Sequence, residues 1–277
     1  MHEAERSETV RAIARAGDPD RALSALFAPR DERADLFALY AFNVELARVA
    51  EQVSEPELGA IKLQWWREAI DKAASGETTG HPVADAFGDV VRRRALAPER
   101  IAALIDARAF DVAPRIMPDL ASLEAYLRDT AGALFVLSAS ILGVQNGVVE
   151  QAAHAAGLAY GLTGLMRALP VHAAGGRLYL PADALRRHGS SPEQVLAGKT
   201  GQGLDETLAE FRAMAREARD EAKHHVEKLD APARTAFLPL SLVDPYLAAL
   251  EKSGRDPLRD IAAINPLYRL WCLARAS

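Results

Sequence analysis

Cysteine, aromatic residues and long apolar runs are all scarce in this chain. Its 277 residues include a single cysteine, Cys272, which excludes an intrachain disulfide and a cysteine-rich zinc cluster. The most apolar stretch, residues 131–144, is well short of the ~20 residues that a membrane-spanning helix needs. These scarcities argue against a disulfide-stapled or membrane-spanning protein, and they favour a reducing compartment.

An excess of positive charge is also missing. The formal net charge is −5, and no basic patch dominates the sequence, so we expect no nucleic-acid partner. Residues 1–8 are acidic and lack an apolar core, which is typical of neither a signal peptide nor an Arg-rich transit peptide. We therefore expect a cytoplasmic protein, and peripheral contact with the inner membrane stays open.

What the chain does contain is alanine, with few β-branched residues and no sustained strand alternation, so helix propensity is high nearly throughout. Apolar periodicity and turn signals predict helices at 31–53, 58–74, 83–95, 98–109, 120–142, 149–169, 192–196, 204–228, 232–243, 244–252 and 266–276. Pro170 is predicted to end the sixth of these. No repeat or long linker divides the chain. The sequence therefore predicts a single-domain helical bundle over 1–277, with 1–17 as a loosely ordered extension.

Five short motifs occur in an order that resembles the squalene/phytoene synthase family. They are LFALYAF at 36–42, QWWR at 64–67, Tyr126 with TAG at 130–132, GLTGLMR at 161–167 and GRLYLP at 176–181. Each is weak alone, but their common order carries a resemblance that covers roughly residues 20–275. The resemblance implies the isoprenoid synthase fold, an all-α bundle around a central apolar cavity.

Members of that family ionise a prenyl diphosphate, and the charge of the leaving pyrophosphate has to be neutralised. Magnesium serves this purpose and is held by carboxylates and by the substrate phosphates. The resemblance implies two Asp-rich motifs on facing helices. Acidic residues four positions apart lie on one face of a helix, one turn from each other.

Both acidic motifs are degenerate in this chain. The first falls at residues 47–51, where Ala47 and Arg48 replace acids and Glu51 remains. The second falls at residues 168–172, where Ala168 and His172 stand in place of aspartates. Arg48 is expected to put a positive charge where a cation should sit. We therefore assign no catalytic residue, no metal ligand and no cofactor, and Mg²⁺ enters only if the chain is an active enzyme.

A closer resemblance within the superfamily is to the phytoene-synthase-like, non-enzymatic assembly factors of respiratory complex I. It is carried by FNVELA at 42–47, QWW at 64–66, HPVA at 81–84 and the segment 165–172. It implies a chaperone-type role with a complex I subunit or assembly intermediate as partner. Two alternatives stay open: a Mg²⁺-dependent transferase that joins two prenyl diphosphates, and a non-catalytic protein that binds an apolar isoprenoid or lipid.

Several single residues have two interpretations. Glu51 is either a relic ligand or an ion-paired surface carboxylate, and His172 is more often a hydrogen-bonded structural residue than a metal ligand. Arg167, Arg177 and Tyr179 either bind a residual anion through charge-assisted hydrogen bonds or brace the loop after residue 170.

The adjacent tryptophans form the other ambiguous feature. Trp65 and Trp66 cannot share one helix face, so we expect one in the core and one half-exposed. With Arg67 they make a candidate surface for a partner protein.

Overall fold

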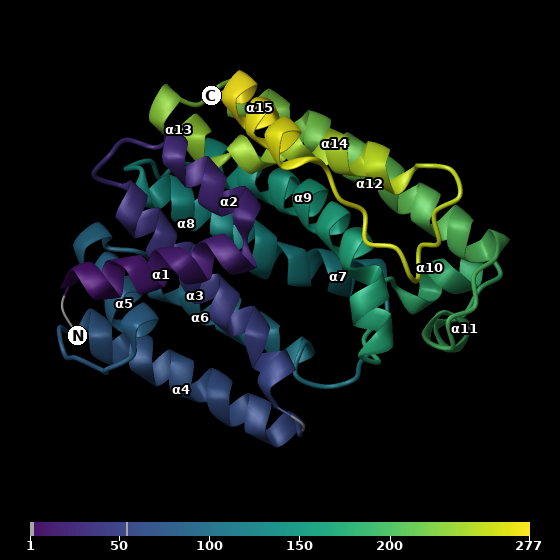
Figure 1. Cartoon of the computed structure of the whole chain (residues 1–277), viewed down its shortest axis with the longest axis horizontal. Helices are drawn as coiled ribbons and strands as arrows, with labels where there is room; N and C mark the ends of the chain where they lie inside the picture. Colours follow the sequence, from purple (N-terminus) through teal and green to yellow (C-terminus); the bar gives the residue numbers. More distant parts are fainter. Residues whose placement is uncertain (1–2, 54) are drawn as a thin grey trace.

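Helices account for the regular structure of the described residues, 3–53 and 55–277 of a computed structural model (Figure 1). No β-strand occurs in these residues; an isolated parallel bridge pairs Ile116 with Leu178. The all-α class predicted from the sequence is therefore confirmed.

The helices follow one another closely along the chain. They are α1 (Glu3–Gly17), α2 (Pro19–Ser24), α3 (Arg33–Gln52), α4 (Pro56–Ala74), α5 (Pro82–Arg94), α6 (Pro98–Ala107), α7 (Leu120–Leu127), α8 (Ala133–Ile141), α9 (Gly147–Ala174), α10 (Ala182–Arg187), α11 (Pro192–Leu196), α12 (Gln202–Val226), α13 (Ala231–Ala236), α14 (Val243–Leu250) and α15 (Pro266–Ala276). A π-helical segment, Arg128–Gly132, joins α7 to α8, and 3₁₀ turns lie at Ala25–Phe27, Arg108–Phe110 and Leu238–Leu242. Most predicted helices are found with shifts of a few residues at their ends.

The core gathers around α3, α8 and α9. Helix α9 packs along α12, and α8 packs against both α3 and α9. Leu36, Leu39 and Phe42 of α3 are almost completely buried at helical spacing. Inside this core the Tyr40 hydroxyl lies 3.0 Å from the Ser138 hydroxyl and ties α3 to α8.

A close approach of two backbones holds α9 against the π-helical segment. A Cβ atom built on Gly157 would lie 2.5 Å from the Cα of Gly132, so position 157 requires glycine. A Cβ atom on Gly132 would lie 3.3 Å from the backbone oxygen of Ala153, which is a tight contact. One turn further along α9, a Cβ on Gly161 would lie 2.5 Å from a methyl of Leu127. This contact brings the middle of α9 next to residues 127–132.

Helix α9 does not end at Pro170, so that prediction was wrong. Pro170 lies inside the helix, which continues to Ala174. Proline removes a backbone hydrogen bond and usually breaks a helix. Here Leu169 and Pro170 are buried, and we infer that this packing outweighs the lost bond. His172 is therefore a helical residue, one turn beyond Ala168.

Residues 3–17 are helical rather than loosely ordered. They form α1, which buries Val10 and Ala14 and packs on α3. At its end, a Cβ on Gly17 would lie 2.3 Å from a methyl of Val44, which shows how closely α1 approaches α3. The short helices α2 and α10 were also not predicted, because six residues carry too little periodicity.

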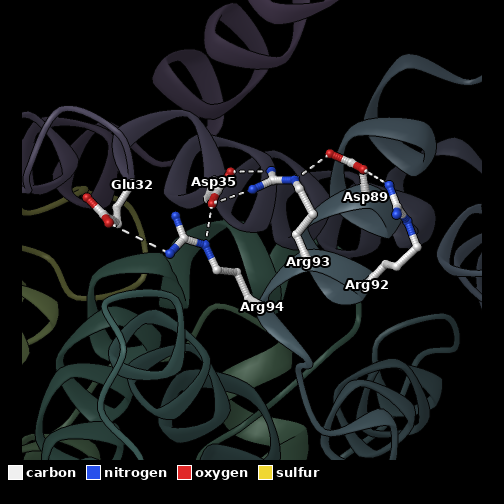
Figure 2. A network of polar contacts seen from close by, with 6 residues as sticks. All are labelled: Glu32, Asp35, Asp89, Arg92, Arg93 and Arg94. Atoms are coloured by element: carbon white, nitrogen blue, oxygen red, sulfur yellow. Dashed lines mark hydrogen bonds and ion pairs between the residues drawn. The ribbon is translucent and has the colours of Figure 1, made fainter.

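An ionic network fastens α3 to the end of α5 (Figure 2). The carboxylate of Asp35, 3% exposed, accepts hydrogen bonds of 2.7 Å from both Arg93 and Arg94. Arg93 also bonds Asp89 at 2.7 Å, and Arg94 lies 3.7 Å from Glu32. The arginines occupy the last turn of α5, where the helix dipole favours positive charge.

Candidate functional site

A cavity of about 280 Å³ lies between α3, α7, the π-helical segment and α9. One wall is apolar and is formed by Leu127, Ala131, Leu134, Gly161, Gly164 and Leu165. The polar wall is formed by Arg21, Asn43, Glu51, Arg108, Asp111, Tyr126, Thr130, Tyr160, His172, Arg177 and Tyr179. Val171, which also lines the cavity, is 52% exposed, so this end reaches the surface.

The polar wall is organised around Asp111, which is 5% exposed. Its Oδ2 accepts a hydrogen bond from Arg108 Nη1 at 3.1 Å. The Tyr126 hydroxyl lies 3.0 Å from Oδ1 and 3.2 Å from Oδ2, and the Tyr179 hydroxyl donates a short bond to Oδ1. Arg108 also bonds Asn43 Oδ1 at 2.7 Å. We call Asp111, Arg108, Tyr126, Tyr179 and Asn43 the cavity cluster.

Burial changes the acid–base behaviour of this wall. It raises the pKa of both Tyr126 and Tyr179 well above the ordinary tyrosine value, so both stay protonated and act as donors to Asp111. Burial also lowers the pKa of His172 to about 4. The ring of His172 lies 4.6 Å from that of Tyr179, and its buried Nδ1 has no hydrogen-bond partner among the described residues. His172 is therefore neutral at pH 7.

Only part of the first degenerate motif, residues 47–51, lines the cavity. Ala47 and Glu51 line it and are exposed at its mouth. Arg48 does not line it; its guanidinium lies 3.5 Å from Glu45, one turn back along α3. The expected placement of Arg48 at the cation position was wrong, because the side chain leaves α3 on another face.

The second degenerate motif is likewise divided. His172 lines the cavity, and Ala168 lies on α9 between the lining residues Gly164 and His172, one turn from each. Arg167 points elsewhere: it donates to the carbonyl of Ala262 at 3.1 Å and lies 3.5 Å over the ring of Tyr246.

Of the three candidate anion-binding residues, the cavity therefore keeps Arg177 and Tyr179 and excludes Arg167. Arg177 Nη1 donates to the backbone carbonyl of Asp111 at 3.2 Å. This bond braces the segment after α9, and the guanidinium still lines the cavity.

The tryptophan pair divides as predicted. Trp66 is 4% exposed and packs edge-on against Phe42, whereas Trp65 is 42% exposed. Trp66 thus belongs to the core and drops out of the candidate partner surface. Arg67 is paired with Asp106 of α6.

Sequence reasoning missed the centre of the polar wall. Asp111 and Arg108 follow α6 in a stretch without a recognisable motif, and Asn43 was noted only as part of a family match. The Arg-x-x-Asp spacing was the available signal, since residues three apart meet on a helical turn. Nothing local indicated that two tyrosines far along the chain would join them.

Magnesium does not fit this donor set. Mg²⁺ wants several hard oxygen ligands in octahedral geometry. Glu51 is the single acid at the two motif positions, His172 offers nitrogen, and the oxygens of Asp111 already accept bonds from three side chains. Across residues 3–53 and 55–277, no three His, Cys, Asp or Glu side chains gather closely enough to hold a metal ion.

Solved structures share this architecture. Squalene synthase HpnC from Alicyclobacillus acidocaldarius matches with a TM-score of 0.79 at 22% identity, over 90% of this chain and 94% of that one. A dehydrosqualene synthase in complex with ligand matches with a TM-score of 0.82 at 16% identity, over 99% and 95%. The chain therefore has the all-helical fold of squalene synthases.

Sequence comparison assigns the family. The model of the squalene/phytoene synthase family matches residues 14–268, and the chain belongs to this family. The NADH dehydrogenase (ubiquinone) complex I assembly factor 6 of Bos taurus is 29% identical to this chain, over 88% of this chain and 73% of its own length. Presqualene diphosphate synthase of Zymomonas mobilis is 28% identical over 89% and 85%, and that of Rhodopseudomonas palustris is 31% identical over 68% and 67%.

Proposed function

We propose that this protein no longer transfers prenyl groups and acts as an assembly factor for respiratory complex I. The observation that carries the proposal is the state of the polar wall. Alanine stands at 47 and 168, a neutral histidine stands at 172, and the nearby buried carboxylate of Asp111 is saturated by its own neighbours.

Electrostatics supports the loss of chemistry. Three arginines, Arg21, Arg108 and Arg177, line the cavity. Its two acids are Glu51 and Asp111, and the carboxylate of Asp111 is already bound by its neighbours. Two unit charges 4 Å apart repel by about 4 kcal/mol at an effective dielectric constant of 20, and a divalent cation feels about twice that. A cluster of magnesium ions would therefore meet repulsion where a synthase has to provide attraction.

The size of the cavity also supports it. Pockets for one drug-sized ligand usually measure about 300–1,000 Å³. The volume here is about 280 Å³. Head-to-head condensation requires two prenyl chains at once, and this space is small for one.

The proposed partner is a subunit or assembly intermediate of complex I, consistent with the name of the bovine relative. A candidate docking surface is the outer stripe of α4. Leu58, Ile61 and Trp65 lie there at helical spacing and are 49%, 65% and 42% exposed. A half-exposed tryptophan in such a stripe is typical of an interface anchor.

Two other functions remain as candidates. The presqualene diphosphate synthase relatives, at 28–31% identity, favour a Mg²⁺-dependent prenyltransferase. The apolar wall of the cavity favours a non-catalytic protein that binds an isoprenoid or lipid. The donor set and the cavity volume argue against the first of these, and the second is compatible with the assembly role.

The first experiment measures pyrophosphate release from farnesyl diphosphate by the purified full-length chain with Mg²⁺. We expect none above the enzyme-free control. Mg²⁺-dependent turnover would overturn the proposal in favour of the transferase.

The second experiment deletes the gene in the native host and measures NADH:quinone oxidoreductase activity and complex I content. Both are expected to fall and to be restored by the wild-type chain. Ile61→Glu on the α4 stripe is expected to restore them poorly, whereas Leu26→Glu, 40% exposed outside that stripe, restores them fully. Unchanged complex I in the deletion strain would exclude the assembly role.

A third experiment tests the location of the lost metal site by calorimetry. The triple variant Ala47→Asp, Ala168→Asp, His172→Asp is expected to gain Mg²⁺ affinity over the wild type. Arg48→Asp is the matched control and is expected to gain none, because its side chain faces away from the cavity. Equal gains in both would contradict the assignment of these helix faces.

A further inference from the structure

Helix α15 is firmly attached to the rest of the molecule by its inner face. Cys272 and Leu273 are buried there in a small cluster with Leu238, Leu242 and Tyr246. On the same helix, Arg269 Nε lies 2.8 Å from a carboxylate oxygen of the buried Asp20. The helix is therefore held by both packing and charge, and its outer face is a fixed surface of the molecule.

That outer face is strongly apolar and exposed. Leu267 is 78% exposed, Trp271 52%, Tyr268 47% and Leu270 43%, and Ile261 just before the helix is 59% exposed. Half of the exposed large hydrophobic side chains in the described residues lie within 261–271. Single exposed apolar residues are ordinary, but a contiguous group on one short helix marks an interaction site.

The charges of this segment have one sign. Residues 261–277 contain no Asp or Glu and two arginines, although the whole chain carries a net charge of −5. The guanidinium of Arg275 lies 5.4 Å over the ring of Trp271, which itself stacks on Tyr268. The carboxylate of Asp244 interacts electrostatically with Tyr268, but it is already paired with Arg219.

We propose that α15 docks the protein on a lipid bilayer surface that carries anionic headgroups. Tryptophan, tyrosine and leucine on one face with an adjoining arginine are the residues that partition into the headgroup boundary. Eleven residues make a helix about 16 Å long, which cannot cross the ~30 Å hydrocarbon core, so it lies in the plane of the surface. In residues 3–53 and 55–277, no helix is long and apolar enough to span a membrane.

Charge, rather than size, distinguishes the α15 face from the α4 stripe. Helix α4 carries the acids Glu57, Glu68 and Asp71, whereas α15 carries two arginines and no acid. Figure 1 also places α15 at one edge of the molecule and α4 at the opposite edge. Docking through α15 therefore leaves the α4 stripe accessible to a protein partner, although neither proposal depends on the other.

The test is co-sedimentation of the full-length protein with vesicles of phosphatidylcholine, with and without about one third phosphatidylglycerol. Binding to the anionic vesicles is expected, with weaker binding to neutral ones. The double variant Leu267→Glu, Trp271→Glu is expected to lower the partition coefficient about tenfold or more. Ile61→Glu, an equally exposed apolar position on α4, is the matched control and is expected to bind like the wild type.

Further measurements test the contribution of charge to binding and the fold of the variant. Arg275→Ala is expected to weaken binding to anionic vesicles but not to neutral ones, and added salt is expected to have the same effect. Circular dichroism of the double variant checks that the fold is kept. No binding to anionic vesicles at low salt, or equal binding by the double variant, would overturn the proposal. Dimerisation of the wild type that the double variant abolishes would instead assign the face to a second copy of the chain.

Discussion

Asp20 and Asp111 are both buried carboxylates that bind two tyrosines, and Asp20 is paired with two arginines whereas Asp111 is paired with one. Asp20 in α2 accepts hydrogen bonds from Tyr246 at 2.9 Å and Tyr160 at 3.2 Å, and it is paired with Arg269 at 2.8 Å and Arg167 at 3.8 Å. We call these five residues the closed cluster. Its members come from α2, α9, α14 and α15, so it joins helices that are far apart in the sequence.

The cavity cluster has a similar composition but a different setting. Asp111, Arg108, Tyr126, Tyr179 and Asn43 all border the cavity, which reaches the surface. Of the closed cluster only Tyr160 borders it, and Asp20 with its two arginines lies outside. Burial raises the pKa of Asp20, a sign that its environment is dry. The comparison teaches that an aspartate beside a synthase-like cavity is not thereby a metal ligand, because its lone pairs are already used by its neighbours.

The largest expected effect is on the closed cluster. Asp20→Ala leaves two arginines without their buried partner, and removing one member of a buried ion pair typically costs 3–5 kcal/mol. We expect a loss of about that size in the free energy of unfolding, measured by urea denaturation. Asp20→Asn, which keeps an acceptor for one tyrosine, should lose less. A loss below about 1 kcal/mol would show that the closed cluster does not hold these helices together.

A smaller loss is expected for Asp111→Ala, about 1–3 kcal/mol by the same measurement. Arg108 keeps its bond to Asn43, Arg177 keeps its bond to the backbone, and water from the cavity is able to replace the carboxylate. If Asp111→Ala destabilised the fold as much as Asp20→Ala, the distinction between an open and a closed cluster would fail.

The pH dependence of stability has opposite signs for His172 on the cavity wall and for Asp20 in the closed cluster. The pKa of His172 is lowered from 6.5 to about 4 by burial, so between these values the unfolded chain takes up a proton that the folded chain does not. Its contribution to stability is present above pH 6.5 and is lost as the pH falls toward 4, on the order of 3 kcal/mol. The raised pKa of Asp20 acts oppositely, because there the folded chain binds its proton first as the pH falls.

Comparison of the wild type with His172→Gln isolates the histidine contribution. The difference between the two unfolding free energies is expected to change between pH 6.5 and 4 and to stay constant between 7 and 8. A constant difference over the whole range would mean that His172 is solvated in the folded state.

The smallest effects are expected from removing single hydroxyls. Tyr246→Phe takes one donor from Asp20, and Tyr179→Phe takes one from Asp111, for losses of about 1 kcal/mol each. The loss should be somewhat smaller for Tyr179, since cavity water is able to supply a donor. Thermal denaturation of the two variants in parallel measures the order, and the reverse order would argue that the cavity cluster is the drier one.

Much of the fold was accessible from the sequence. Helical periodicity predicted α3, α4, α5, α12 and α15 within a few residues, because an apolar stripe of period 3.6 can be recognised from the local sequence alone. The absence of acids at Ala47, Ala168 and His172 was also visible, since it needs only a motif and its register. Pro170 misled the prediction because a local rule was outweighed by burial of α9 along its length.

The amino-acid sequence alone determined the helical class, the family resemblance and the loss of paired carboxylates. Only the tertiary structure decided that Arg48 and Arg167 face away from the cavity and that Asp111 joins Tyr126 and Tyr179 on its wall. The physical reason is that the spacing of residues along a helix determines only which side chains lie on the same face of that helix. The direction of that face is set by long-range packing between helices, such as the contact of Gly132 with Gly157.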